Sequence, residues 1–348
     1  MERTVIIGGG DAGLIAAAYL ERADETDVLL VSEREYHVFS FLLYDVITGT
    51  PLRRARLDIP STFREKDVTF VRGLVEGIDA TENRIDLRSG SLHFDTLLIA
   101  VGGVTAYNID DRRHVFDIRT DAREIQSAVN SPNIRDVVVV GGGPVGVETT
   151  AALSSVADTD VTLVTSSRRL LPDFPPRASR IADRELRRRA RLKTGTQVME
   201  VTENGVVLDG DDTELNDLTV WAGGVRPNPV IENFGLARNE CGLRVDSHLR
   251  CLDTNNVYAA GDVVDYPEKM KDGFSAGLEA RAAAKNLLRG LRGQRPIEHD
   301  VRWHPRIVDL GGGNALLSVN GMVYHGRGPA FVRAVAVKGY PFYWKSRY

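Results

Sequence analysis

The sequence predicts an α/β fold that contains one strand–turn–helix unit twice. Residues 4–7 (TVII) form a short β-type run that leads into Gly8–Gly13 (GGGDAG) and then into the helical sequence LIAAAYLERA. Residues 137–140 (VVVV) lead in the same way into Gly141–Gly146 (GGGPVG) and VETTAALSSVA. Both turns read G-x-G-x-x-G between a strand and a helix, the pattern that binds the diphosphate of a dinucleotide at a helix N-terminus.

The three glycines of such a turn have separate tasks. The first makes the tight bend, the second lets the backbone approach the diphosphate, and the third lets the helix pack on the strand. We expect the first turn to bind through Gly8, Gly10, Asp11, Ala12 and Gly13. We expect the second turn to bind through Gly141, Gly143, Pro144, Val145 and Gly146. Two such units predict two dinucleotides held face to face, of which a flavin and a nicotinamide are the natural pair.

A residue at the end of the strand that follows each unit should bind the adenosine ribose. Glu33 stands about twenty residues after the first turn, where a carboxylate binds the ribose hydroxyls. The matching position in the second unit is Ser166, followed by Ser167, Arg168 and Arg169. Without an acid there, a ribose 2′-phosphate is tolerated, so we expect NADPH to be accepted beside NADH. The alternative, that these arginines are solvated loop charges, stays open.

The remaining elements follow in chain order. The first unit continues into short alternating strands that predict a β-hairpin insert, and into a buried strand at 94–100. The second unit has its own β-ribbon and a closing strand at 218–221. No low-complexity linker separates the parts, so we expect the second domain to be inserted in the first. The expected domains are a flavin-binding domain at 1–105 and 226–300, a nicotinamide-binding domain at 106–225 and a short C-terminal segment at 301–348.

Composition narrows the function classes. The chain has 348 residues, enough for two or three domains, and only two cysteines, Cys241 and Cys251. Two cysteines exclude a disulfide-rich secreted scaffold and a metal site built from cysteine alone, and we expect no metal. The net charge of −4 gives no bulk attraction to nucleic acid. Because a membrane-spanning stretch and a signal peptide are both missing from the sequence, we expect a cytoplasmic protein.

Three further segments, at 94–102, 221–229 and 256–262, resemble motifs of the pyridine nucleotide–disulfide oxidoreductase superfamily. These flavoproteins have two dinucleotide-binding domains of the Rossmann-like FAD/NAD(P)-binding fold. The resemblance implies FAD and a nicotinamide nucleotide as cofactors. It adds Arg34, Ala100, Gly102, Gly261, Asp262, Gly273 and Phe274 to the expected FAD site, and Gly224 to the NAD(P)H site.

The segment at 36–49 (YHVFSFLLYDVITG) contains no cysteine beside the flavin, which excludes the thiol–disulfide branches of the superfamily. It resembles the flavin-side loop of type II NADH dehydrogenases, membrane-associated enzymes that pass electrons to quinone. The resemblance implies hydride transfer from NAD(P)H to FAD and transfer of two electrons to a quinone or another small acceptor. It also implies a catalytic, proton-handling role for Glu148, which otherwise is only a helix-dipole carboxylate.

The sequence leaves alternatives open for the electron acceptor. Residues 270–279 are closer to a sulfide:quinone oxidoreductase or flavocytochrome pattern, although no cysteine is placed for sulfide chemistry. A ferredoxin-type reductase, and a nicotinamide-sensing flavoprotein resembling apoptosis-inducing factor, are the other candidates. The aromatic and basic segment Phe331–Tyr348 suits the inner surface of the cell membrane. Alternatively it packs on the flavin domain, since Pro341 should prevent one long helix. The sequence does not decide between a monomer and a homodimer.

Overall fold

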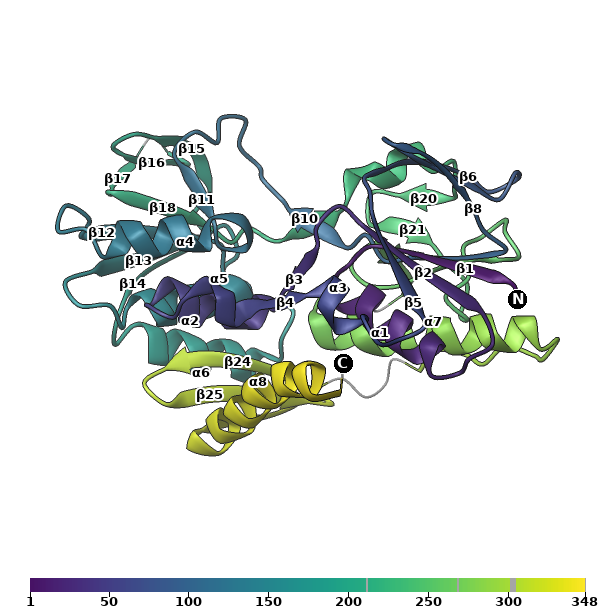
Figure 1. Cartoon of the computed structure of the whole chain (residues 1–348). Coiled ribbons are helices and arrows are strands. Elements are labelled where there is room, and N and C mark those ends of the chain that lie inside the picture. The colour runs from purple at the N-terminus through teal and green to yellow at the C-terminus, as the bar shows by residue number, and fades with distance from the viewer. Residues whose placement is uncertain (211, 268, 301–304, 348) are drawn as a thin grey trace.

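The computed structural model describes residues 1–210, 212–267, 269–300 and 305–347, with side chains described as far as Trp344. Tyr348 and the side chains of residues 345–347, part of the predicted membrane segment, lie outside the described residues. Two five-stranded parallel sheets form the centres of two lobes (Figure 1). The α/β fold predicted from the two glycine turns is therefore confirmed, while the exact domain boundaries stay a prediction.

The first sheet contains the strand before the first glycine turn at its centre. Its order is β22 (Val257–Ala259), β9 (Thr96–Ile99), β1 (Arg3–Ile7), β2 (Asp27–Ser32) and β5 (Val68–Arg72). One face packs on helices α1 (Asp11–Glu21) and α7 (Gly273–Leu291), which lie side by side. Alanines line this contact, and their small side chains let the two helices approach closely. The other face is covered by the ribbon β6 (Val75–Asp79), β7 (Arg84–Leu87) and β8 (Gly90–His93), together with residues around β21 (Gly242–Arg244) and β23 (Val264–Asp265).

The second sheet repeats this plan. Its order is β11 (Val115–Asp117), β18 (Leu218–Trp221), β12 (Asp136–Val140), β13 (Asp160–Thr165) and β14 (Arg191–Thr194). Helices α4 (Ile118–Val129), α5 (Pro144–Leu153) and α6 (Pro176–Leu186) accompany it, as does the ribbon β15 (Val198–Thr202), β16 (Gly205–Leu208) and β17 (Thr213–Leu215). The chain enters this lobe through β10 (Gly103–Thr105) and leaves it through β19 (Val225–Pro227), and these two strands pair antiparallel.

A segment of the first lobe reaches across to the second. The strands β3 (Tyr36–Val38) and β4 (Arg56–Asp58) lead to and from helix α2 (Leu43–Ile47), which packs on α4 and α5. The apolar side chains of Leu43, Val46 and Ile47 enter the core of the second lobe. The segment predicted as the flavin-side loop therefore connects the two lobes.

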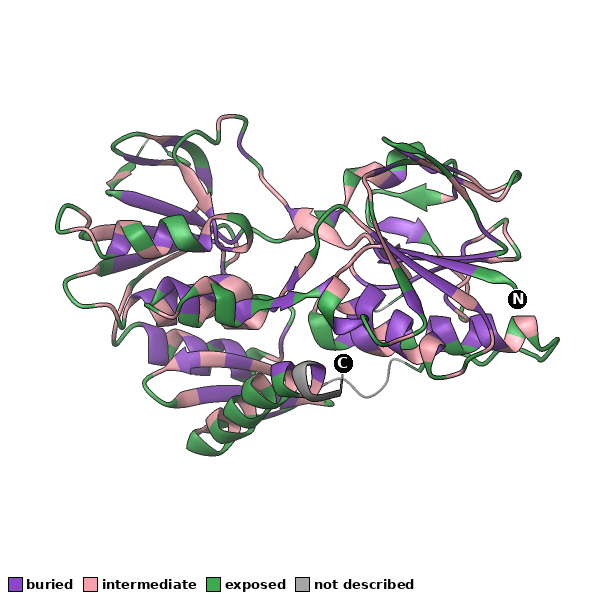
Figure 2. Ribbon diagram, viewed as in Figure 1, coloured by how far each residue is buried: buried purple, intermediate pink, exposed green. Residues whose placement is uncertain are grey.

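The C-terminal segment contains a small sheet and a helix. Strands β24 (Arg306–Gly311), β25 (Asn314–Val319) and β26 (Met322–Gly326) form an antiparallel sheet that packs on α5 and α6. Helix α8 (Arg327–Arg347) follows and crosses that sheet, with a largely exposed outer face (Figure 2). The expectation that Pro341 prevents one long helix was wrong, because α8 runs through it. A proline inside a helix costs about 3 kcal/mol, and here burial of Pro341 and Trp344 offsets the lost hydrogen bond.

Candidate flavin and nicotinamide sites

The two glycine turns have the same backbone geometry. At Gly8, φ is +114° and an added Cβ would lie 2.1 Å from the Ala100 carbonyl oxygen. At Gly141, φ is +126° and an added Cβ would lie 2.2 Å from the Ala222 carbonyl oxygen. Only glycine fits these bends, since each combines a left-handed conformation with contact to the neighbouring strand end. The first glycine of each turn thus has the role that the sequence predicted.

The third glycines bring each helix against its own turn. A Cβ at Gly13 would lie 1.8 Å from the Gly8 oxygen, and a Cβ at Gly146 would lie 1.9 Å from the Gly141 oxygen. Both positions therefore exclude every side chain. The first turn of α1 and the first turn of α5 consequently begin directly at the ends of β1 and β12.

The second glycines border open space. Gly10 and Gly143 are the N-caps of α1 and α5, both in extended conformation and neither with a side-chain cap. An added Cβ at either position meets no atom of the described chain within 4 Å. The first backbone N–H groups of a helix have no acceptor within it, and the helix dipole favours an anion there. Each helix end therefore has room for a diphosphate, and its binding there stays a prediction.

The second flavin motif presents a carboxylate with an unused acceptor atom. Asp262 follows β22, and within the described chain its buried Oδ1 has no hydrogen-bond partner. Its Oδ2 lies 3.8 Å from Nη2 of Arg119, which reaches over from α4 in the other lobe. Burial raises the pKa of the Asp262 carboxyl, and the charge of Arg119 opposes this rise. This environment fits a hydroxyl donor such as the ribityl chain of FAD.

A buried polar cluster holds this motif in place, and no sequence motif predicted it. Oε2 of Glu279 on α7 accepts a 2.7 Å hydrogen bond from the Gly261 backbone N–H. Oε1 of the same carboxylate accepts from the Tyr266 hydroxyl at 2.6 Å and from the Lys269 ammonium at 2.5 Å. Glu279 is fully buried, and Lys269 nearly so. The cluster thereby holds the backbone of Gly261, the residue before Asp262, in place.

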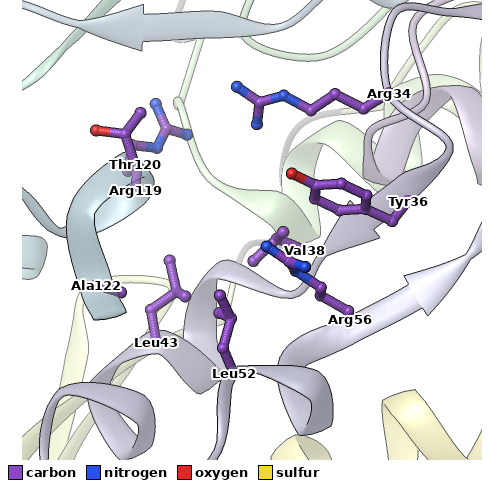
Figure 3. Close-up of a pocket in the computed structure, with 9 residues that line it drawn as sticks. All are labelled: Arg34, Tyr36, Val38, Leu43, Leu52, Arg56, Arg119, Thr120 and Ala122. Carbon is purple, nitrogen blue, oxygen red and sulfur yellow. The ribbon is translucent and has the colours of Figure 1, made fainter. Parts of the chain in front are cut away.

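Three arginines converge at a cleft between the lobes (Figure 3). Arg34, Arg56 and Arg119 line a cavity of about 140 Å³ without any acidic side chain among its lining residues. The Arg56 guanidinium lies 4.2 Å from the centre of the Tyr36 ring, which fixes its orientation. Because Arg119 also approaches Asp262, the cleft borders the proposed flavin site. Of these arginines the sequence predicted only Arg34, since Arg56 and Arg119 belong to no motif.

Glu148 lies where four segments meet. Its Oε1 accepts a 2.9 Å hydrogen bond from the backbone N–H of Asp309 on β24. The same oxygen lies 3.5 Å from Nε of Arg333 on α8, whose Nη1 lies 3.0 Å from Asp309 Oδ2. The Tyr44 hydroxyl on α2 also hydrogen-bonds the carboxylate. Burial raises the pKa of the Glu148 carboxyl, and the Arg333 charge lowers it in part.

The predicted ribose-binding positions lie at matching strand ends. Glu33 and Arg34 are exposed after β2, and Ser166 and Arg168 are exposed after β13. Arg169 is not available to a phosphate, which corrects the expectation from the sequence. Its guanidinium hydrogen-bonds the Phe174 and Pro172 carbonyl oxygens and the Ser179 hydroxyl inside the second lobe.

The other expected site residues mark the rims of these two sites. Gly102 and Gly224 have φ values of +67° and +115°, and at neither would an added Cβ meet an atom of the described chain within 4 Å. Gly273 begins α7 behind the N-cap Asp272, and Phe274 beside it is 43% exposed. A Cβ at Gly273 would lie 3.5 Å from Asp11 Oδ2, so the starts of α7 and α1 meet.

The cysteines lie apart from this chemistry. Cys241 is exposed, whereas Cys251 is buried, and both are free thiols. Burial raises the pKa of Cys251 to about 12, which keeps its thiol protonated and unreactive.

Comparison with known proteins agrees with the resemblance found in the sequence. Over 96% of its length the chain is 25% identical to the type II NADH:quinone oxidoreductase of Staphylococcus aureus, of which it covers 94%. It is 26% identical over 91% of its length to an NADH dehydrogenase-like protein of Mycobacterium tuberculosis, of which it covers 87%.

Solved structures share the fold. The sulfide:quinone oxidoreductase of Aquifex aeolicus matches with a TM-score of 0.88 at 20% identity, over 100% of this chain and 92% of that one. NDH2 of Plasmodium falciparum in complex with NADH matches with a TM-score of 0.83 at 19% identity, over 99% and 96% of the two chains. The sequence profile of one family matches residues 2–277. The chain belongs to the pyridine nucleotide-disulphide oxidoreductase family.

Proposed function

We propose that this chain is an FAD-dependent dehydrogenase that takes hydride from NADH or NADPH and passes two electrons to a quinone. The proposal rests on one observation. Two helices of this chain begin at an uncapped glycine beside open space, α1 at Gly10 and α5 at Gly143. A flavin at one end and a nicotinamide at the other bring a hydride donor and its acceptor into one protein. The relative named for NADH:quinone oxidoreduction supports this choice of donor and acceptor.

The chain's own residues bind and orient the cofactors. The N–H groups at the starts of α1 and α5 bind the two diphosphates, and Oδ1 of Asp262 accepts a hydrogen bond from the ribityl chain. The cleft formed by Arg34, Arg56 and Arg119 neutralises negative charge beside the flavin site. When bound, FAD supplies the chemistry that accepts a hydride and releases electrons.

Glu148 is the candidate proton-handling residue. Burial raises the pKa of its carboxyl, so it holds a proton more readily than an exposed glutamate. The Tyr44 hydroxyl and the Asp309 backbone N–H fix the carboxylate in one orientation. A group with these properties can exchange a proton as the acceptor is reduced.

The direct test is anaerobic turnover of NADH with different acceptors. We expect menaquinone or ubiquinone to raise NADH oxidation at least about tenfold above the rate without an acceptor. Turnover with a ferredoxin alone would favour a ferredoxin-type reductase. Fast reduction of the flavin, with negligible reoxidation by every quinone, would favour a nicotinamide-sensing protein. Sulfide-driven reduction of the flavin without NADH would favour a sulfide:quinone oxidoreductase.

We propose further that the outer face of α8 docks on an anionic membrane surface, where a lipid-soluble quinone is found. Phe331 and Phe342 are each 71% exposed, and Val335 is 56% exposed. At 100° per residue these three side chains share one face of the helix, with exposed Lys338 among them. Apolar side chains that insert, together with a cation that meets lipid headgroups, suit peripheral binding. No helix in the described part of the chain has the length and hydrophobicity to span a membrane.

Sedimentation with anionic vesicles tests this surface. We expect replacement of Phe331, Val335 and Phe342 by serine to release the protein from the vesicles while FAD stays bound. Met322→Ser is the matched control, because Met322 is 56% exposed but lies on β26 beside the helix. Unchanged vesicle binding by the triple variant would count against the membrane surface.

A further inference from the structure

The first glycine turn contains an acid at a position where an anion is expected. Asp11 is the first residue of α1 and directly follows the bare N-cap Gly10. The helix N-terminus attracts a diphosphate, and the same field attracts the Asp11 carboxylate. Two negative charges within a few ångströms repel each other. Binding of FAD therefore depends on how this carboxylate is oriented and satisfied.

The structure ties the Asp11 carboxylate to the C-terminal helix. The Tyr340 hydroxyl on α8 donates a 3.1 Å hydrogen bond to Asp11 Oδ1. Nε2 of His37, which is only 7% exposed, lies 3.3 Å from the same oxygen. The Tyr340 ring is held in turn by Phe39 and Phe41, with ring centroids 5.7 Å and 5.8 Å away. These contacts come from segments remote from the glycine turn in sequence.

Helix α8 has two faces with different neighbours. Arg333 and Tyr340 are seven residues apart, which is nearly two full turns, so they share the inner face. Arg333 reaches Glu148 on α5, and Tyr340 reaches Asp11 on α1. Phe331, Val335 and Phe342 lie on the opposite, exposed face. One helix therefore contacts an acid of each dinucleotide-binding unit.

We propose that Tyr340 is a positioning residue of the flavin site, which orients the Asp11 carboxylate and so permits a diphosphate to bind at the start of α1. The hydroxyl is the part of Tyr340 that performs this task, while the ring packs with the neighbouring aromatic side chains. Asp11 is the residue through which it acts. Helix α8 thus belongs to the cofactor-binding structure as well as to the outer surface.

The test is the dissociation constant of FAD for apoprotein variants, measured by quenching of flavin fluorescence. We expect Tyr340→Phe to weaken FAD binding about tenfold, because the ring remains but Asp11 loses its donor. Asp11→Asn should bind FAD at least as tightly as the wild type, since the repelling charge is gone. The double variant should match Asp11→Asn within about twofold, because Tyr340 acts only through Asp11.

Tyr324→Phe is the matched control. Tyr324 is also in the C-terminal segment, but it is 51% exposed and, within the described residues, its hydroxyl donates its hydrogen bond to Met322 Sδ, at 3.6 Å. We expect its FAD affinity to equal that of the wild type, and thermal unfolding of each apoprotein shows whether the variants fold alike. An unchanged FAD affinity in Tyr340→Phe would overturn the proposal. An equal loss in the Asp11→Asn background would also overturn it, since the effect would then be independent of Asp11. Neither result depends on which acceptor the enzyme uses.

Discussion

The two glycine turns share a backbone and differ in the side chains around it. Both bend at a glycine with positive φ, and both begin a helix at a bare, uncapped glycine. The first turn has Asp11 at the first helical position and Glu33 at the next strand end, whereas the second has Pro144 and Ser166 there. The shared backbone gives both turns the same open helix end, whereas the side chains at the first helical position and at the strand ends set the two turns apart.

The segments that cover the two turns also differ. Helix α7 and the Tyr340 end of α8 lie beside the first turn. The second helix, α5, is covered by the C-terminal sheet and by Arg333. The same C-terminal segment therefore meets both turns, with a neutral hydroxyl donor at one acid and a cation at the other.

Valine at the second glycine of either turn gives the largest expected effects. Gly10→Val should weaken FAD binding about a hundredfold or more, because the new side chain fills the space that the diphosphate needs. Gly143→Val should retain FAD and raise the KM for NADH by a similar factor. Flavin content and steady-state kinetics measure the two effects.

Thermal unfolding of the apoproteins is the control for this pair. Both glycines have extended backbone and open space around Cβ, so neither change should destabilise the fold. If Gly143→Val lost FAD as completely as Gly10→Val, the assignment of separate cofactors to the two turns would fail.

The next largest effect is expected from Glu148→Gln. We expect turnover to fall about a hundredfold, the usual contribution of a general acid or base, while FAD content stays normal. Glu185→Gln is a suitable control, since this buried glutamate lies on α6 and pairs with surface arginines. If Glu148→Gln left turnover unchanged, Glu148 would have a structural role and no catalytic one.

Replacement of Ser166 by glutamate gives the end of β13 the acid that Glu33 provides at the end of β2. We expect Ser166→Glu to lower kcat/KM for NADPH about tenfold relative to NADH, because the new carboxylate repels a 2′-phosphate. Arg168→Ala should act in the same direction but less strongly. A wild-type enzyme that already rejects NADPH would contradict the expected tolerance of both nucleotides.

The smallest expected effect is on how the stability of the fold depends on pH. Because burial raises the pKa of Glu148 above its ordinary value of 4.5, the folded chain retains this proton at pH values where the unfolded chain has lost it. The group therefore destabilises the fold increasingly as pH rises from 4.5 to the raised pKa of the folded chain. Glu148→Gln removes this contribution, so its melting temperature relative to the wild type should rise with pH. If the melting temperature of Glu148→Gln relative to the wild type fell as pH rises, the pKa of Glu148 would be lowered in the folded chain and not raised.

The sequence predicted what depends on local pattern. Glycine turns, the strands before them and the closing strands are local features, and the fold class and family drawn from them are confirmed. The partners of Glu148 were not predictable, because Asp309 and Arg333 come from a sheet and a helix that fold back over α5. The continuation of α8 through Pro341 was missed for a related reason, since burial of Trp344 outweighs local preference.

The most direct test of the account is rapid mixing of the holoenzyme with NADH and then with quinone, in the absence of oxygen. At an NADH concentration near the wild-type KM, we expect the flavin to bleach quickly in the wild type and far more slowly in Gly143→Val. We expect menaquinone to restore the wild-type colour at a rate that sustains turnover. Bleaching of the flavin in Gly143→Val as fast as in the wild type would contradict nicotinamide binding at the second turn. Failure of every quinone to reoxidise the wild-type flavin would contradict the proposed acceptor.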